Sequence, residues 1–306
     1  MLPEQFCVRM KEMLGEEYAA FYASYDLPKY QALRINPLKT ERDTFLQQAP
    51  FSLNRVPWTT NGYYYSGNDQ PGRHPYHEAG VYYIQEPSAM APAEYLMAEP
   101  GERILDLCAA PGGKSIFAAL MMEGTGHVIS RDVSEKKTGQ IEENVQRLGL
   151  GNISVETADA LEHNLADEET ADMLLADIPC SGLAIIGRKP DIKYNVSREK
   201  LDGIVRLQRD ILDSVCSYVK HGGYLVYSTC TLNPKENEEN VRYIMEKGFA
   251  PVDINDLLPE SLVNDAKKAG EKYLDKLHSD AARGMLTLIP GVYECDGFFV
   301  AKLKRI

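Results

Sequence analysis

Hydrophobic and polar positions along the chain become regular near residue 101. After that point, short apolar runs alternate with longer segments whose apolar residues recur every three or four positions. The short runs predict buried strands and the longer segments predict helices. The strands are expected at 103–109, 126–132, 153–157, 172–177, 224–228, 284–290 and 297–303, and the helices at 113–122, 134–149, 200–219 and 234–248. Strands that alternate with helices in this way predict a parallel sheet covered on both faces.

The first 80 residues follow a less regular pattern. Phe6, Met10 and Leu14 have helical spacing, and the segments 30–40 and 51–65 predict short strands and turns around a modest core. Gly, Pro and His are frequent at 66–80, which predicts a domain boundary or a long surface connection. We therefore expect an N-terminal domain at 1–80 and a larger domain at 81–306.

Composition narrows the class of protein. The 306 residues are 44% hydrophobic, as is usual for folded domains, and no stretch approaches 18 consecutive apolar residues. Charges come too early for a secretory signal, so we expect a cytoplasmic protein without a membrane segment. The six cysteines include no C-x-x-C pair, which predicts reduced thiols and neither a disulfide framework nor a metal site.

The formal net charge of −12 argues against a protein that coats nucleic acid non-specifically, because phosphate contacts need clustered cations. A local basic groove remains compatible with this charge. Segment 187–200 is the candidate, with Arg188, Lys189 and Lys193 as its first cations. The alternative is an ordinary solvated loop followed by a helix start.

The residues directly after the strands are the candidates for ligand binding, because ligands of open α/β sheets lie beyond the carboxyl ends of the strands. The first strand is followed by a loop of small residues and then by a predicted helix N-terminus, as in a nucleotide site. Position 108 is Cys rather than Gly, so the P-loop pattern fails, and G-x-G-x-x-G is absent. An S-adenosylmethionine site remains, in which Asp132 would hold the ribose and Asp159 the adenine.

Two cysteines follow two other strands, Cys180 in "DIPCSG" and Cys230 in "YSTCT". If these strands are neighbours, both thiols face one pocket, beside the Asp177 carboxyl that can bond the edge of a base. A thiolate suits methylation of cytosine, since carbon 5 becomes nucleophilic only after addition at carbon 6. A helix with Asn233 as N-cap and Glu236 at N3, a pattern close to the capping box, would favour the thiolate of Cys230. This reasoning alone does not decide which thiol is the nucleophile.

The motifs "DLCAAPGGK", "DIPCSG", "RKPDIK" and "YSTCT", in this order and approximate spacing, resemble the Nop/Sun family of RNA cytosine-C5 methyltransferases. The resemblance covers about residues 80 to 306, with a weaker match through "LRINPLK". The opening "LPEQFCVRMKEML" is most similar to the bacterial branch of the ribosomal RNA small subunit methyltransferase F type. Bacterial members commonly continue past the end of this chain into another RNA-binding region, which we expect to be missing or supplied otherwise.

The resemblance implies a role for each motif. Cys230 would be the nucleophile, Cys180 would help to release the product, and Asp177 would contact the cytosine and lie near the cofactor. Arg188, Lys189 and Lys193 would bind RNA. The S-adenosylmethionine site would comprise Cys108, Ala109, Ala110, Pro111, Gly112, Gly113, Lys114, Asp132, Lys137, Asp159 and Asp177.

The expected fold is therefore α/β: a Rossmann-like S-adenosylmethionine-dependent methyltransferase domain with a smaller α+β, RRM-like N-terminal domain. The expected substrate is 16S ribosomal RNA or the small ribosomal subunit, and the expected state is a monomer. Two alternatives stay open. One is a P-loop-like ATPase, suggested by "GGKS" and "LLAD". The other is a non-catalytic protein that binds RNA and the cofactor.

Overall fold

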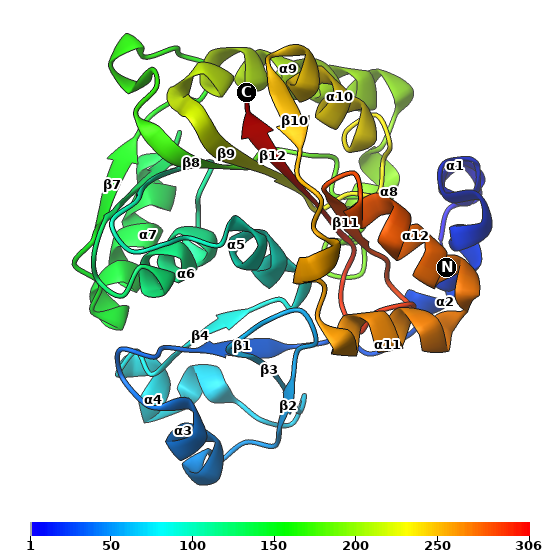
Figure 1. The fold of residues 1–306 in the computed structure, drawn as a ribbon. Coiled ribbons are helices and arrows are strands. Elements are labelled where there is room, and N and C mark those ends of the chain that lie inside the picture. Colours follow the sequence, from blue (N-terminus) through cyan, green and yellow to red (C-terminus); the bar gives the residue numbers. More distant parts are fainter. Residues whose placement is uncertain (1) are drawn as a thin grey trace.

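The computed structural model describes residues 2–306 and contains two β-sheets (Figure 1). An N-terminal helical segment precedes them and consists of α1 (Glu4–Leu14) and α2 (Tyr18–Ser24). The buried side chains of α1 are Phe6, Met10 and Leu14, which confirms the predicted amphipathic opening.

The first sheet has four antiparallel strands in the order β2-β3-β1-β4. One helix follows β1 and another follows β3, which is the β-α-β-β-α-β order of the expected RRM-like fold. Segment 66–80 connects β3 to β4, so this sheet extends past residue 80. Its elements are β1 (Ala32–Ile35), α3 (Arg42–Gln48), β2 (Leu53–Arg55), β3 (Gly62–Tyr65), α4 (Pro75–Glu78) and β4 (Tyr82–Gln85).

The second sheet has eight strands in the order β10-β12-β9-β8-β5-β6-β7, with β11 paired to β12. The predicted parallel pairing is confirmed from β5 to β9, but β12 runs antiparallel to β9, so the sheet is mixed. Its strands are β5 (Arg103–Leu107), β6 (His127–Asp132), β7 (Ile153–Thr157), β8 (Ala171–Asp177), β9 (Val219–Thr229), β10 (Phe249–Pro251), β11 (Met285–Leu288) and β12 (Phe298–Arg305).

Helices cover both faces of this sheet (Figure 1). On one face, α9 buries Ile211 and Val215 in the same core as Leu174 of β8. On the other face, Ile116 of α6 and Ile141 of α7 share a core with Ile104 of β5. The helices of this domain are α5 (Ala91–Leu96), α6 (Gly113–Met121), α7 (Glu135–Leu148), α8 (Ile192–Asn195), α9 (Arg198–Val215), α10 (Glu238–Glu246), α11 (Glu260–Ala269) and α12 (Glu271–Ala281).

The predicted helix at 234–248 begins later than the sequence pattern indicates. Helix α10 starts at Glu238 with Asn237 at its N-cap, so the prediction of Asn233 as N-cap is wrong. Instead, the Asn233 carbonyl accepts hydrogen bonds from the backbone N–H groups of Glu236 and Asn237 in a turn. In this turn the Glu236 side chain points into the core, where polar side chains donate hydrogen bonds to it.

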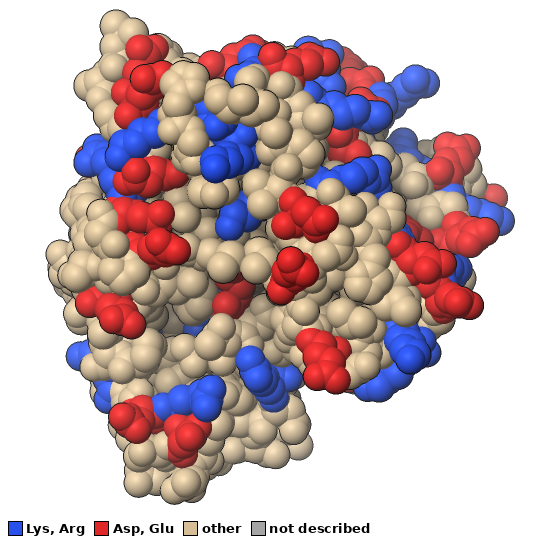
Figure 2. All heavy atoms as spheres, viewed as in Figure 1, with Lys and Arg blue, Asp and Glu red and all other residues tan. Residues whose placement is uncertain are grey.

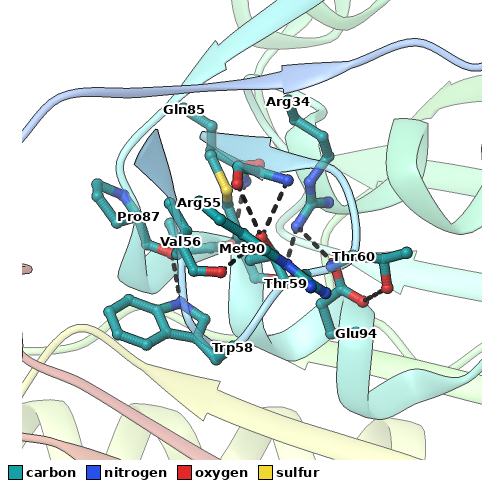
Figure 3. A network of polar contacts seen from close by, with 12 residues as sticks. Arg34, Arg55, Val56, Trp58, Thr59, Thr60, Gln85, Pro87, Met90 and Glu94 are labelled. Atoms are coloured by element: carbon teal, nitrogen blue, oxygen red, sulfur yellow. Dashed lines mark hydrogen bonds and ion pairs between the residues drawn. The ribbon is translucent and has the colours of Figure 1, made fainter. Parts of the chain in front are cut away.

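The N-terminal sheet is fixed to the larger domain through a network of polar contacts (Figure 3). Arg34 donates to the Met90 carbonyl at 2.9 Å, and the Trp58 indole donates to the Pro87 carbonyl at 2.8 Å. The guanidinium of Arg34 also lies 3.4 Å from the ring centroid of Phe117 in α6. Because α6 follows the loop at 108–112, these contacts place the N-terminal sheet beside that loop.

Candidate active site

The site lies where the strand order reverses, between β5 and β8. Strands β6 and β7 extend from β5 to one side, and β9 and β12 extend from β8 to the other. Ligands of open α/β sheets bind outside the carboxyl ends of the strands at such a point. The loops after β5, β8 and β9 carry Cys108, Cys180 and Cys230, so the topology gathers the predicted motifs at one edge of the sheet.

The loop after β5 needs its two glycines for different reasons. Gly112 has φ +97°, a left-handed conformation that residues with a side chain rarely adopt. A Cβ atom on Gly113 would lie 2.9 Å from Gln85 Nε2 and 2.9 Å from Tyr83 Cε1, both on β4. The first glycine allows the turn and the second allows the N-terminal sheet to pack against the start of α6. The sequence pattern predicted the small residues but not this second reason for them.

Asp132 and Asp159 stand at the ends of β6 and β7, as predicted. Asp132 is buried, and its carboxylate accepts from the Ala110 N–H at 3.3 Å and pairs with Lys137 Nζ at 3.3 Å. Asp159 accepts from the Leu161 N–H at 2.9 Å. Asp132 therefore touches the loop after β5 directly, whereas Asp159 belongs to the loop after β7.

A cavity of about 600 Å³ opens beside these loops. Cys108, Val133, Asp159 and Pro179 line it from the ends of β5, β6, β7 and β8, and helix α9 adds Leu207, Ile211 and Val215. The size falls in the range of small-molecule and cofactor sites, and the mostly apolar wall with a few polar groups is typical of them. Of the two acidic residues predicted to hold the ribose and the adenine, Asp159 lines this cavity.

Lys114 and Asp177 form an ion pair between the start of α6 and the end of β8. Lys114 Nζ lies 2.6 Å from Asp177 Oδ2, and Ser228 Oγ donates to Asp177 Oδ1 at 2.7 Å. Burial alone would lower the pKa of Lys114, but Asp177 outweighs it and the pKa is raised. Lys114 is therefore a fixed cation. Ser228 was not predicted, although it stands two residues before Cys230 in "YSTCT".

The two predicted thiols are in contact. Cys180 Sγ and Cys230 Sγ lie 3.2 Å apart, because β8 and β9 are neighbours paired in parallel through Asp177 and Ser228. The hydrogen bond with Cys230, together with burial, raises the pKa of Cys180 well above its ordinary value. Cys180 is therefore a protonated thiol, which can donate a hydrogen bond to its neighbour.

Three other cysteines have raised pKa values, which disfavour their thiolate forms. Burial raises the pKa of Cys108 to about 12, with a further contribution from Asp132. Burial likewise raises the pKa of Cys216 to about 12, and it raises that of Cys295. Thiolates are the reactive form, so these three side chains stay unreactive at neutral pH. Within residues 2–306, no group of three or more His, Cys, Asp or Glu side chains is placed to hold a metal ion.

The predicted RNA-binding cations differ in their surroundings. Lys189 is exposed. Lys193 Nζ donates to the Tyr25 hydroxyl at 2.7 Å. Arg188 pairs with the buried carboxylate of Asp296 and also donates to the Tyr30 carbonyl. On the face in Figure 2, acidic and basic side chains are interspersed, in keeping with the acidic composition.

The residues at the loop after β5 fit S-adenosylmethionine. The buried Asp132 is an acceptor suited to ribose hydroxyls, and the α6 N-terminus and the apolar cavity lie next to it. The mixed sheet, the order of its strands and this loop define the fold and the cofactor site of the S-adenosylmethionine-dependent methyltransferase class. In the part of the chain that the structure describes, no helix is long and apolar enough to cross a membrane.

The chain belongs to the RsmB/F family of 16S rRNA methyltransferases, whose sequence pattern matches residues 93–304. Residues 2–87 match the N-terminal domain of 16S rRNA methyltransferase RsmF. The ribosomal RNA small subunit methyltransferases F of Cronobacter sakazakii and Citrobacter koseri are 33% and 34% identical over 99% of this chain. The chain spans 63% of the length of each of these relatives.

Two solved structures share the fold. A methyltransferase homologue from Pyrococcus horikoshii is 27% identical, with a TM-score of 0.78 over 99% of this chain and 95% of that one. NSun6 from Pyrococcus horikoshii, solved with SFG, has a TM-score of 0.80 over 99% of this chain and 98% of that one. At 21% identity, the second likeness concerns the fold alone. The family match confirms the predicted family and disfavours the P-loop alternative.

Proposed function

We propose that this chain methylates carbon 5 of a cytosine in 16S ribosomal RNA, with Cys230 as the nucleophile. The observation that carries the proposal is the contact between Cys180 and Cys230, 3.2 Å apart at the ends of β8 and β9. The match to a family of 16S rRNA methyltransferases supports the substrate. With this substrate the enzyme acts in the cytoplasm, and we propose that it does so as a monomer.

Cys230 starts the reaction as the thiolate, after its proton has passed to solvent, by forming a bond from Sγ to carbon 6 of the cytosine. The electron pair of the carbon 5–carbon 6 double bond then shifts towards carbon 5, which becomes nucleophilic. S-adenosylmethionine, when bound, supplies an electrophilic methyl group. After methylation, Cys180 assists removal of the carbon 5 proton, as part of a relay or as base once its own proton has left, and the proton passes on to solvent. The carbon 5–carbon 6 double bond forms again and the bond to Cys230 breaks.

The residues around the thiols supply orientation and charge. Lys114 and Ser228 hold both oxygens of Asp177, so the carboxylate has a fixed position from which to contact the cytosine edge. The residues from Cys108 to Lys114, together with Asp132 and Asp159, would hold the cofactor, and Lys137 would hold Asp132. Lys189 and Lys193 would contact phosphates, with Arg188 beside them. The target base must leave its stack to reach this site.

The test is to incubate the protein with unmodified small-subunit ribosomal RNA and S-adenosylmethionine that carries a labelled methyl group. Digestion of the RNA to nucleosides should then place the label in 5-methylcytidine. The control is Cys230→Ala, which should leave the RNA unlabelled. Binding of RNA and cofactor without label in cytosine would support the non-catalytic alternative instead.

A further inference from the structure

The carboxylate of Glu236 is buried beneath the two thiols and accepts hydrogen bonds from both of the loops that carry them. Glu236 is 0% exposed and stands between β9 and α10. Its Oε2 atom accepts from the Ser181 N–H at 2.8 Å, and its Oε1 atom accepts from the Ser181 hydroxyl at 2.5 Å. Ser181 directly follows Cys180 in the chain. The position of Cys180 therefore depends on this carboxylate.

The same carboxylate holds the loop that follows Cys230. Asn233 Nδ2 donates to Glu236 Oε1 at 2.8 Å. The hydroxyls of Ser181 and Thr231 are 2.8 Å apart, and Thr231 directly follows Cys230. Thr231 is 0% exposed, so water does not replace these contacts. One buried side chain thus joins the residues next to each thiol.

Helix α9 contributes the remaining hydrogen bond. Gln208 Nε2 donates to Glu236 Oε2 at 3.1 Å and to the Pro179 carbonyl at 2.9 Å. Asn240 donates to Gln208 Oε1 at 2.8 Å, which fixes the orientation of this amide. Among the described residues, no ion pair includes Glu236, and its carboxyl group is held by hydrogen bonds from neutral groups. A buried carboxylate is costly, and this cost implies a role beyond filling space.

From this geometry we infer that Glu236 is a positioning residue for methyl transfer, which holds the loops of Cys180 and Cys230 so that the two thiols stay in contact. The inference rests on the proposed function for its role in the reaction. The part of the inference that concerns the contact between the two thiols does not depend on the proposed function. Neither the motifs nor the family match assigns this role to Glu236.

Glutamine cannot replace this carboxylate, although it has nearly the same size. The four groups around Glu236 are all donors: the N–H and hydroxyl of Ser181 and the amides of Gln208 and Asn233. The amide nitrogen of a glutamine would face a donor. Asn233 cannot turn without losing the bond that its Oδ1 accepts from the Lys235 N–H at 3.2 Å. Glu236→Gln therefore loosens the loops of both thiols.

The experiment compares Glu236→Gln with Glu239→Gln in the full chain. Glu239 lies on the surface of α10, where its nearest cation, Arg209, is 3.8 Å away, so the control removes the same charge from the same segment. The first measurement is closure of a Cys180–Cys230 disulfide by diamide, which takes two hydrogens from the thiols and is reduced to a hydrazine. Mass spectrometry of the linked peptides gives the rate without RNA or methyl donor.

The second measurement is the rate of covalent adduct formation on RNA that contains 5-fluorocytosine, where the fluorine blocks release. Glu236→Gln should slow both disulfide closure and adduct formation by at least about tenfold, since it breaks hydrogen bonds to a charged group. The Kd for S-adenosylmethionine should stay within about twofold, because the cofactor loop is untouched. Glu239→Gln should match the wild type in all three measurements.

Disulfide closure at the wild-type rate in Glu236→Gln would overturn the inference. The wild-type protein could form no adduct on RNA while the two variants still differ in the rate of disulfide formation. In that case the proposed function fails and the positioning role stands. If Glu236→Gln does not fold, as judged by its thermal unfolding, Ser181→Ala serves in its place. It removes only the hydroxyl contacts to Glu236 and Thr231, and unchanged closure in this variant would likewise refute the role.

Discussion

Cys180 and Cys230 come from loops fifty positions apart, yet their Sγ atoms lie 3.2 Å from each other. The distance follows from the parallel pairing of β8 and β9, in which Asp177 stands opposite Ser228. Each thiol comes shortly after its strand, so the two loops meet at the same edge of the sheet. Contact between the thiols lets one affect the protonation of the other, and the hydrogen bond with Cys230, together with burial, raises the pKa of Cys180 well above its ordinary value.

The two thiols should give opposite results when they are replaced one at a time. Cys230→Ala should abolish both methylation and covalent adducts with RNA, because it removes the thiol proposed to add to carbon 6. Cys180→Ala should accumulate a stable adduct, because addition proceeds but release is impaired. A denaturing gel of protein mixed with RNA and S-adenosylmethionine separates these outcomes. The reverse pattern would mean that the two roles are exchanged.

The sequence predicted most of the second domain because its strands and helices have regular apolar periods. Strands β5 to β8 and helices α6, α7 and α9 lie close to their predicted ranges. Helix α8 was not predicted, and β9 begins at Val219, within the range predicted for the preceding helix. Helices α11 and α12 were not predicted, although they bury Leu262 and Leu277. The antiparallel direction of β12 could not be predicted from local pattern, since it depends on the path of the connection before the strand.

The motifs located the site, but they could not show how its residues contact one another. Lys114 was expected in the cofactor loop, and its pairing with Asp177 depends on the neighbouring position of β5 and β8. Glu236 was interpreted as part of a helix cap, whereas it is a buried acceptor for Ser181. Such contacts join segments that are distant in sequence, so neither the apolar periodicity nor the spacing of the motifs predicts them.

Asp177→Asn should destabilise the protein by about 3 kcal/mol, because it leaves the largely buried ammonium of Lys114 without its counterion. It should also slow methylation, since the carboxylate that contacts the base is lost. The free energy of unfolding in urea measures the first effect. The control is Asp202→Asn, which breaks an exposed pair with Lys235 and should leave stability unchanged. Equal stability of the two variants would contradict the buried pair.

Asp132→Ala should weaken binding of S-adenosylmethionine by at least about tenfold, or about 1.4 kcal/mol. Asp132 is the buried acceptor next to Ala110, and its replacement removes the proposed partner of the ribose hydroxyls. Calorimetric titration of the cofactor gives the Kd directly. Lys137→Ala should have a smaller effect, since Lys137 contacts Asp132 from an exposed position. An unchanged Kd in Asp132→Ala would place the cofactor elsewhere.

Lys189 and Arg188 should respond differently to replacement by alanine. Lys189→Ala should lower the slope of log K against log salt for RNA binding by about one, as expected for the loss of one phosphate contact. Arg188→Ala should instead lower the thermal stability, because Asp296 loses the partner that balances its buried charge. Filter binding over a series of salt concentrations and thermal unfolding measure the two effects. If the slope of log K against log salt instead falls by about one in Arg188→Ala, the ion pair between Arg188 and Asp296 opens so that Arg188 binds phosphate.

Asp106 should make the stability of the protein fall as the pH rises. Burial raises the pKa of Asp106 from 3.8 to about 7 in the folded protein. Between these values the folded state binds a proton that the unfolded state has released, so folding is favoured at the lower pH. From about pH 5 to about pH 8 this group alone should cost about 3 kcal/mol of stability.

Asp106→Asn isolates this contribution from that of the other carboxylates. Asparagine stays neutral over the whole range, so the variant should lose less stability than the wild type as the pH rises. The quantity to compare is the free energy of unfolding in urea of both proteins, each at about pH 5 and about pH 8. Asp106 Oδ1 has no hydrogen-bond partner in the fold, which allows an amide to occupy the same place. Parallel pH profiles for the two proteins would mean that Asp106 is already ionised at the lower pH, despite its complete burial.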